Sequence, residues 1–292
     1  MHTVEVKGIL SSNNGMNIYR GCSHGCIYCD ARSTCYQMKH AFEDIEVKIN
    51  APKLLEDALR RKRKKCMIGT GAMCDPYLHI EKELKLTRRC LELIDTYGFG
   101  VAIQTKSDMI LRDMDLLQSI NNKTKAVVQM TLTTADENLC KIVEPAVCTT
   151  KRRFEVLCTM KEAGIPTVVW MSPLLPFIND TEENLMEILD YCRRAGVYGI
   201  ITFGMGLTLR DGDRQHFYKC LDRHFPGLKQ KYIEVYKDAY EIPSLKSRQL
   251  YQLFEKTCKQ YGIISNTNSI FTYMNTFEEK GVGEQLSLFL EK

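Results

Sequence analysis

The stretch Gly21-Cys22-Ser23-His24-Gly25-Cys26-Ile27-Tyr28-Cys29 is the most informative part of the chain. Its spacing is Cys-x3-Cys-x2-Cys, so three thiolates can converge on one metal centre. A tetrahedral zinc site needs a fourth ligand, whereas an iron–sulfur cube with three cysteine ligands leaves one iron free for a substrate or cofactor. The spacing therefore favours a [4Fe–4S] cluster over zinc, and over three ordinary buried thiols.

Around this stretch, short apolar runs alternate with helical patterns. Pro52 suits the first turn of a helix that carries Leu55 and Leu59, and Asp180 with Glu183 has the spacing of a capping box at the start of another helix. Strands and helices that alternate in this way predict βαβ units and a parallel sheet with right-handed crossovers. We expect strands over Asn17–Arg20, Cys66–Gly69, Gly100–Gln104, Ala126–Leu132, Thr167–Met171 and Gly199–Phe203.

The number of βα units sets the fold class. A closed eight-unit barrel takes about 250 residues, and the units here end near Gly206. We therefore expect an α/β fold with a partial (β/α)6 barrel over residues 1–210. Residues 211–292 are expected to form a C-terminal extension of helices and loops packed on the barrel. The cysteine stretch directly follows the first expected strand, where barrel-type folds carry their chemistry.

Composition limits the classes of protein. The 292 residues include 13 cysteines, and no apolar run is long enough to span a membrane. The first ten residues lack the apolar stretch of a secretory signal, so we expect a cytoplasmic protein with reduced thiols. The basic run Arg60–Lys65 carries +6 against a net charge of +4, so the rest of the chain carries −2. We expect this run to be a solvated surface at the end of a helix, remote from the cysteines.

The chain resembles the radical S-adenosylmethionine (SAM) superfamily, and within it the branch related to spore photoproduct lyase, also labelled DNA repair photolyase. The resemblance covers roughly Met16 to Gly227. It rests on Asn17-Ile18-Tyr19-Arg20-Gly21-Cys22, His24-Gly25-Cys26 and Tyr28-Cys29-Asp30-Ala31-Arg32. It implies a [4Fe–4S] cluster that chelates SAM and cleaves it reductively to a 5′-deoxyadenosyl radical. It also implies a one-electron reductant such as flavodoxin or ferredoxin.

The same resemblance implies roles for individual residues. Cys22, Cys26 and Cys29 would be the cluster ligands. Residues expected to contact SAM are Tyr28 at the adenine, Asp75 at the methionine amino group, Lys106 with its neighbour Ser107 at the carboxylate, and Thr131 at the carboxylate or ribose. Cys74 lies slightly downstream of the position from which spore photoproduct lyases donate hydrogen. It is therefore the thiol we nominate as hydrogen donor or radical quencher.

The substrate is open at this stage. A nucleic-acid lesion is the first candidate by resemblance, and radical modification of a protein or small molecule is the alternative. Phosphate contacts could come from Lys151, Arg152, Arg153, Arg210 and Arg214, and base stacking from Phe177 or Tyr77. A third reading is a zinc-stabilised nucleic-acid-binding module without enzyme activity. In that reading Cys35 and His40 would be further zinc ligands.

Overall fold

The computed structural model describes residues 1–280. Its strands are β1 (His2–Val4), β2 (Gly15–Met16), β3 (Tyr19–Arg20), β4 (Glu46–Lys48), β5 (Met67–Thr70), β6 (Gly100–Thr105), β7 (Ala126–Thr131), β8 (Thr167–Trp170), β9 (Gly199–Ile201), β10 (Gly206–Thr208) and β11 (Glu241–Pro243). Its α-helices are α1 (Ala51–Arg61), α2 (Glu81–Leu84), α3 (Leu86–Thr96), α4 (Met114–Lys123), α5 (Glu137–Val143), α6 (Thr150–Glu162), α7 (Glu182–Ala195), α8 (Asp213–His224), α9 (Leu228–Tyr236), α10 (Ser247–Tyr261) and α11 (Thr267–Asn275). Short 3₁₀ helices are η1 (Asp30–Arg32), η2 (Thr34–Tyr36) and η3 (Asp108–Asp113).

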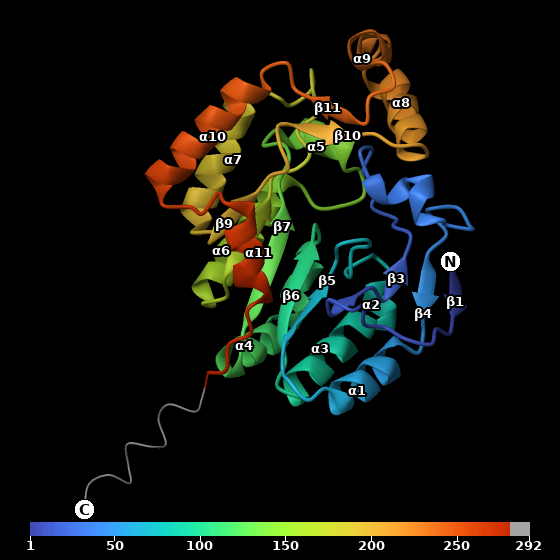
Figure 1. Ribbon diagram of the computed structural model, residues 1–292, viewed down its shortest axis with the longest axis vertical. Coiled ribbons are helices and arrows are strands. Elements are labelled where there is room, and N and C mark those ends of the chain that lie inside the picture. Colours follow the sequence, from blue (N-terminus) through green and yellow to red (C-terminus); the bar gives the residue numbers. More distant parts are fainter. Residues whose placement is uncertain (281–292) are drawn as a thin grey trace, which may run out of the picture.

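A six-stranded parallel sheet forms the centre of the fold, in the order β2-β5-β6-β7-β8-β9. Its two edge strands do not pair with each other, so the barrel is open, and helices such as α1, α3, α4 and α6 lie along its outside (Figure 1). Each strand follows its neighbour in the chain, because βαβ crossovers add one parallel strand at a time. The expected α/β fold with a partial (β/α)6 barrel is confirmed.

Apolar runs explain the central strands. Every residue of β7 is buried, as are most residues of β6, which is typical of parallel strands covered on both faces. Register is set by pairs such as Val101 with Ala126 and Val128 with Thr167. Five of the expected strands are confirmed within two residues of their predicted ends.

The first expected strand is wrong. The strand that joins the central sheet is Gly15–Met16, which pairs with β5. The chain then leaves the sheet, and Tyr19–Arg20 pairs antiparallel with β4 in a separate three-stranded sheet of order β1-β4-β3. The backbone of Asn17–Ile18 is held there by residue Lys48, whose ammonium donates to Asn17 O and whose amide donates to Ile18 O.

Helix α7 shows a second correction. The predicted cap, Asp180, accepts from the amide of Phe177 and the hydroxyl of Ser244 instead. Thr181 is the N-cap, and its hydroxyl accepts from the Asn184 amide at 3.1 Å. The capping function is therefore displaced by one residue, because the Asp180 carboxylate is already used to fix the preceding turn.

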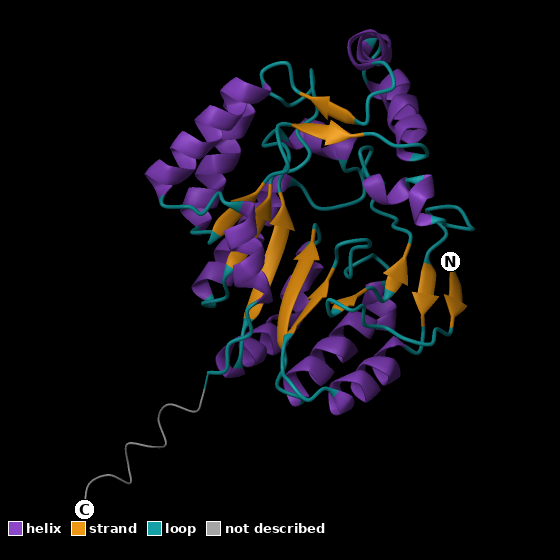
Figure 2. Ribbon diagram, in the orientation of Figure 1, coloured by secondary structure: helices purple, strands orange, loops and turns teal. Residues whose placement is uncertain are grey.

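The C-terminal part of the chain is helical, as expected, but it also contains β10 and β11, which pair antiparallel across the expected boundary at residue 210. They lie with α8 and α9 at the side toward which β6 and β7 point (Figure 2; labels in Figure 1). The division into 1–210 and 211–292 stays a prediction, and residues 281–292 of the expected extension lie outside the described residues.

The basic run lies at the end of α1 and leads into β5. This is the N-terminal end of the parallel strands, opposite the cysteine stretch, as expected. Arg60 pairs with Glu56, and Lys62 donates to Asn14. Among residues 1–280, no helix is both long and apolar enough to cross a membrane.

Candidate active site

The cysteine stretch forms a loop that backbone hydrogen bonds hold in place. The Cys22 amide donates to Phe42 O at 3.0 Å, and the Ile27 amide donates to Val143 O at 3.0 Å. Gly21 begins the loop with a φ of +84°, and a Cβ on it would lie 2.5 Å from Phe42 O. The close approach of these two backbone segments therefore requires glycine at the entrance to the loop.

The loop forms one wall of a cavity of about 640 Å³. The opposite walls come from residues at the C-terminal ends of β5 to β9 and from the β10–β11 ribbon. Parallel strands end at the same edge of a sheet, so residues distant in sequence meet there. The expected site residues that line this cavity are Cys22, Cys26, Tyr28, Cys29, Cys74, Asp75, Lys106 and Thr131.

Cys22 is the most acidic thiol of the three expected ligands. A hydrogen bond from Cys74 lowers the pKa of Cys22 well below its usual value, and His24 lowers it further against the effect of burial. Burial raises the pKa of Cys26 and of Cys29, while Lys106 acts in the opposite direction on both. The protein thus places a cation next to the two thiols whose ionisation burial opposes, which favours their thiolate forms on metal binding.

Asp75 is fully engaged with its surroundings. One carboxylate oxygen accepts from the Thr105 hydroxyl at 2.7 Å and the Tyr77 amide at 2.9 Å. The other accepts from the Lys106 amide at 2.7 Å and lies 3.5 Å from His24 Nδ1. Asp75 therefore connects the loop after β5, the end of β6 and the cysteine loop.

A buried ionic network supports Tyr28 and Lys106. The Tyr28 hydroxyl donates to Glu144, and Glu144 pairs with Arg153 at 2.6 Å, where both charged side chains are fully buried. Lys106 Nζ lies 5.8 Å from the centre of the Tyr28 ring. Burial opposes the charge of Lys106, but Cys26 and Glu144 outweigh it and raise the Lys106 pKa. Lys106 is therefore a cation inside the cavity.

The remaining expected residues differ in their surroundings. Thr131 is buried at the end of β7 and lines the cavity, and its carbonyl accepts from Arg153 at 2.9 Å. Ser107 caps η3, since its hydroxyl accepts from the Met109 amide at 3.2 Å. Ser107 is not among the residues that line the cavity. Its predicted contact with SAM stays a prediction.

Several candidate contacts for nucleic acid are used inside the protein. Arg153 is fully buried against Glu144, and Tyr77 is fully buried. Arg214 donates to the carbonyl groups of Leu209 and Ala239. Arg153 and Tyr77 are therefore not open to a phosphate or a base, and the partly exposed Arg214 is engaged by these carbonyl groups, which corrects the expectation from sequence.

Sequence reasoning did not identify the aromatic side of the cavity. Trp170 lies at the end of β8, and its indole N–H donates to Gln129 at 2.8 Å. Phe203 follows β9, with its ring centre 5.7 Å from that of Trp170, and 68% of it is exposed. Both rings border the cavity, so they offer it an aromatic surface. The sequence signal for Phe203 was its position as the last residue of the expected strand Gly199–Phe203.

The donor set fits an iron–sulfur cluster better than a single zinc ion. Ligands of one tetrahedral zinc ion are about 4 Å apart, and within residues 1–280 the three sulfur atoms do not form a group with all separations below 4.8 Å. Cys35 is exposed and accepts from Ser33 and Arg210, and His40 lies with His2 and Asp44. Neither therefore completes a zinc site with the three cysteines. A cluster takes each thiolate at a separate corner.

Residues 16–192 match the family model described as the radical SAM superfamily. The chain belongs to this superfamily. Uncharacterized proteins of two organisms are similar to this radical SAM protein. One from Mycobacterium tuberculosis (strain H37Rv) is 30% identical over 241 residues, which are 78% of this chain and 68% of the relative. One from Methanocaldococcus jannaschii is 36% identical over 174 residues, which are 59% of this chain and 64% of the relative.

Solved structures agree with the fold of this radical SAM protein. A mutant of spore photoproduct lyase with bound AdoMet and dinucleoside spore photoproduct has a TM-score of 0.60 and 12% sequence identity. The match covers 86% of this chain and 74% of the lyase. Another mutant of the lyase has a TM-score of 0.63 at 12% identity, over 90% of this chain and 79% of its own. At this identity the likeness concerns the fold.

Proposed function

We propose that this radical SAM enzyme binds a [4Fe–4S] cluster through Cys22, Cys26 and Cys29. The observation that carries the proposal is that all three thiols border one cavity, together with the Lys106 ammonium, at the C-terminal edge of the sheet. When bound, the cluster would supply an electron that cleaves SAM to a 5′-deoxyadenosyl radical. A flavodoxin or ferredoxin would deliver that electron.

The proposed tasks of the surrounding residues follow from their contacts. Lys106 pairs with the carboxylate of SAM, because its ammonium is charged within the cavity. Asp75 holds the Lys106 backbone and the Thr105 hydroxyl in place, so that its main task is positioning. Tyr28 presents its ring to the adenine while its hydroxyl is fixed by Glu144. Thr131 lines the far side of the same space.

Cys74 is proposed as the hydrogen donor or quencher. It is buried, it donates to Gly21 O at 2.7 Å, and burial raises its pKa well above the usual value. A thiol that stays protonated can give up a hydrogen atom, whereas a thiolate cannot. The pKa direction therefore supports this task.

A lesion in a nucleic acid is the first candidate substrate. The fold of spore photoproduct lyase and the Trp170–Phe203 wall support it, because an extruded base stacks on aromatic rings. A peptide or small molecule is the second candidate. The charges on the cavity wall favour this second candidate. Three carboxylates, those of Asp30, Asp75 and Glu241, line the cavity against one lysine, Lys106, and carboxylates repel a polyanion.

The test is an anaerobic reaction of the reconstituted protein with dithionite and SAM, followed by chromatography for 5′-deoxyadenosine. We expect a low yield without substrate, well above that of Cys22→Ala, together with about four irons per chain by metal analysis. Ultraviolet-irradiated DNA and a peptide mixture are then added in separate reactions. The reaction that contains the correct class of substrate should show increased SAM turnover. A yield equal to that of Cys22→Ala, with the cluster present and reducible, would refute the proposal.

A further inference from the structure

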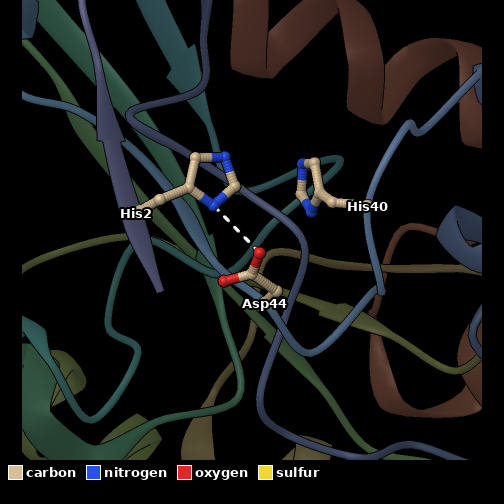
Figure 3. A group of neighbouring side chains, drawn as sticks. All are labelled: His2, His40 and Asp44. Atoms are coloured by element: carbon tan, nitrogen blue, oxygen red, sulfur yellow. Dashed lines mark hydrogen bonds and ion pairs between the residues drawn. The ribbon is translucent and has the colours of Figure 1, made fainter.

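Two histidines and one carboxylate meet beside the three-stranded sheet, and none of them lines the cavity. His2 lies on β1, while His40 and Asp44 belong to the segment that leads into β4. One ligand atom from each residue lies within 4.8 Å of the other two. Figure 3 shows the two imidazole rings beside each other, with the Asp44 carboxylate below them. Two segments of the chain, β1 and the one that leads into β4, thus present potential metal ligands to one point.

The distances are close to those of a metal site. His2 Nδ1 lies 3.0 Å from Asp44 Oδ2, and the two ring centres are 4.8 Å apart in an edge-to-face arrangement. Nitrogen and oxygen ligands about 2.0–2.2 Å from a zinc ion are about 3.4 Å apart in a tetrahedral arrangement. The His2–Asp44 pair therefore needs to move apart by only a few tenths of an ångström, and His40 has its ligand atom within 4.8 Å of both.

His40 has an acceptor beside each ring nitrogen. Ala41 O lies 3.0 Å from Nδ1, and Glu46 Oε2 lies 3.6 Å from Nε2. Nε2 is buried and has no hydrogen-bond partner. A histidine that binds a metal usually donates its other N–H to a carbonyl or carboxylate. If the unpartnered Nε2 of His40 takes the ion, Ala41 O is already in place as the acceptor for Nδ1–H.

We propose that His2, His40 and Asp44 bind one divalent first-row transition metal ion, for which Zn²⁺ is a probe. Two imidazoles and a carboxylate suit Zn²⁺ or Fe²⁺ and not Mg²⁺, which takes oxygen ligands. Water completes the coordination, since His2 and Asp44 are each 39% exposed at the side chain.

The site has a structural consequence for the active site. His40 and Asp44 flank Phe42, whose carbonyl accepts from the Cys22 amide and whose ring lies 4.3 Å from the Arg32 guanidinium. An ion that joins this segment to β1 would brace the backbone that holds the first cysteine of the loop. The ion is therefore a stabilising element of the cysteine loop and takes no part in the reaction.

The experiment titrates the anaerobic, cluster-loaded protein with Zn²⁺ by calorimetry, because the cluster then occupies the three cysteines. We expect one Zn²⁺ per chain. His2→Ala and His40→Ala should each weaken Zn²⁺ binding more than about 100-fold. Loss of a residue that only hydrogen-bonds to a metal ligand weakens binding about 10- to 100-fold. The matched control is His224→Ala, which removes an exposed histidine of α8 and should leave the affinity unchanged. Fe²⁺ in a parallel titration identifies the preferred metal, and Mg²⁺ should give no binding.

Two further measurements test whether the ion binds to cysteine thiols instead, and whether a variant loses binding because it is misfolded. Co²⁺ bound at this site should show ligand-field bands without thiolate-to-metal charge transfer. Hydrogen exchange of residues 38–45 should slow on Zn²⁺ addition in the wild type and not in His40→Ala. Equal Zn²⁺ affinity in the wild type and both histidine variants, or a thiolate band with Co²⁺, overturns the proposal. Neither outcome bears on SAM cleavage, which is measured separately.

Discussion

Replacement of Glu144 by glutamine should strongly destabilise the protein. Glu144 and Arg153 are both fully buried and 2.6 Å apart. Loss of one partner leaves the other charge buried without compensation, at about 3–5 kcal/mol. Glutamine can still accept from Tyr28, and Arg153 keeps its bonds to Thr131 O and Cys148 O. We therefore expect the lower end of that range, about 3 kcal/mol.

A double-mutant cycle isolates the pair from its other contacts. Arg153→Met alone should also destabilise, because it leaves the Glu144 carboxylate unpaired. The double variant Glu144→Gln/Arg153→Met removes both charges of the pair, so its loss should be smaller than the two single losses together. The expected coupling energy is about 2–3 kcal/mol.

The assay is anaerobic urea unfolding followed by far-ultraviolet circular dichroism, with equal m-values required across the four proteins. The control variant Arg193→Met removes a solvent-exposed ion pair with Asp190 and should change stability by less than about 1 kcal/mol. A coupling energy below about 1 kcal/mol for the Glu144–Arg153 pair would mean that water reaches it. The reasoning about a dry support behind Tyr28 would then fail.

Three further predictions concern the site and the pH dependence. Cys22, Cys26 and Cys29 changed together to Ala should lose the bound iron and sulfide, and full content in that variant would place the cluster elsewhere. Lys106→Ala should weaken SAM binding about 10- to 100-fold, as loss of a charged hydrogen bond of about 1.5–3 kcal/mol predicts, while iron content stays unchanged; unchanged affinity by calorimetry would contradict the role. Burial raises the pKa of Asp213 to about 6. An acid with a raised folded pKa loses stability as pH rises from its unfolded value of about 3.9 through 6. The free energy of unfolding of Asp213→Asn should therefore increase relative to that of the wild type between pH 4 and pH 7. If the two free energies change in parallel over this range, Asp213 is not the source of the pH dependence.

Local patterns in the sequence were sufficient for much of this fold and site. The cysteine spacing lies within one loop, and the strands that end at Thr105 and Thr131 are mostly apolar. The resemblance named Asp75, Lys106 and Thr131, and their positions after or near the ends of parallel strands agreed that they would share a space with the cysteines. Each of these inferences depends on neighbours in sequence or on a general rule of βα folds.

The features that sequence reasoning missed depend on contacts between distant segments. Asn17–Arg20 reads as a strand, but its neighbours Lys48 and β4 draw it out of the central sheet. Nothing in the sequence indicated a role for Glu144. Its role depends on its contacts with Tyr28, 116 residues earlier, and with the buried Arg153. A charged residue reveals its task only through what surrounds it after folding.

Arg153 shows why this matters for the substrate. In the sequence it is a cation next to Lys151 and Arg152, and a basic cluster of this kind suggests phosphate binding. In the fold it is bound to Glu144, and Arg152 pairs with Asp108 and Glu155. The positive charge that remains at the cavity is Lys106, which the proposed carboxylate of SAM would neutralise. A nucleic-acid substrate would then have to be held by stacking on Trp170 and Phe203 more than by its phosphates, and its binding should depend only weakly on salt.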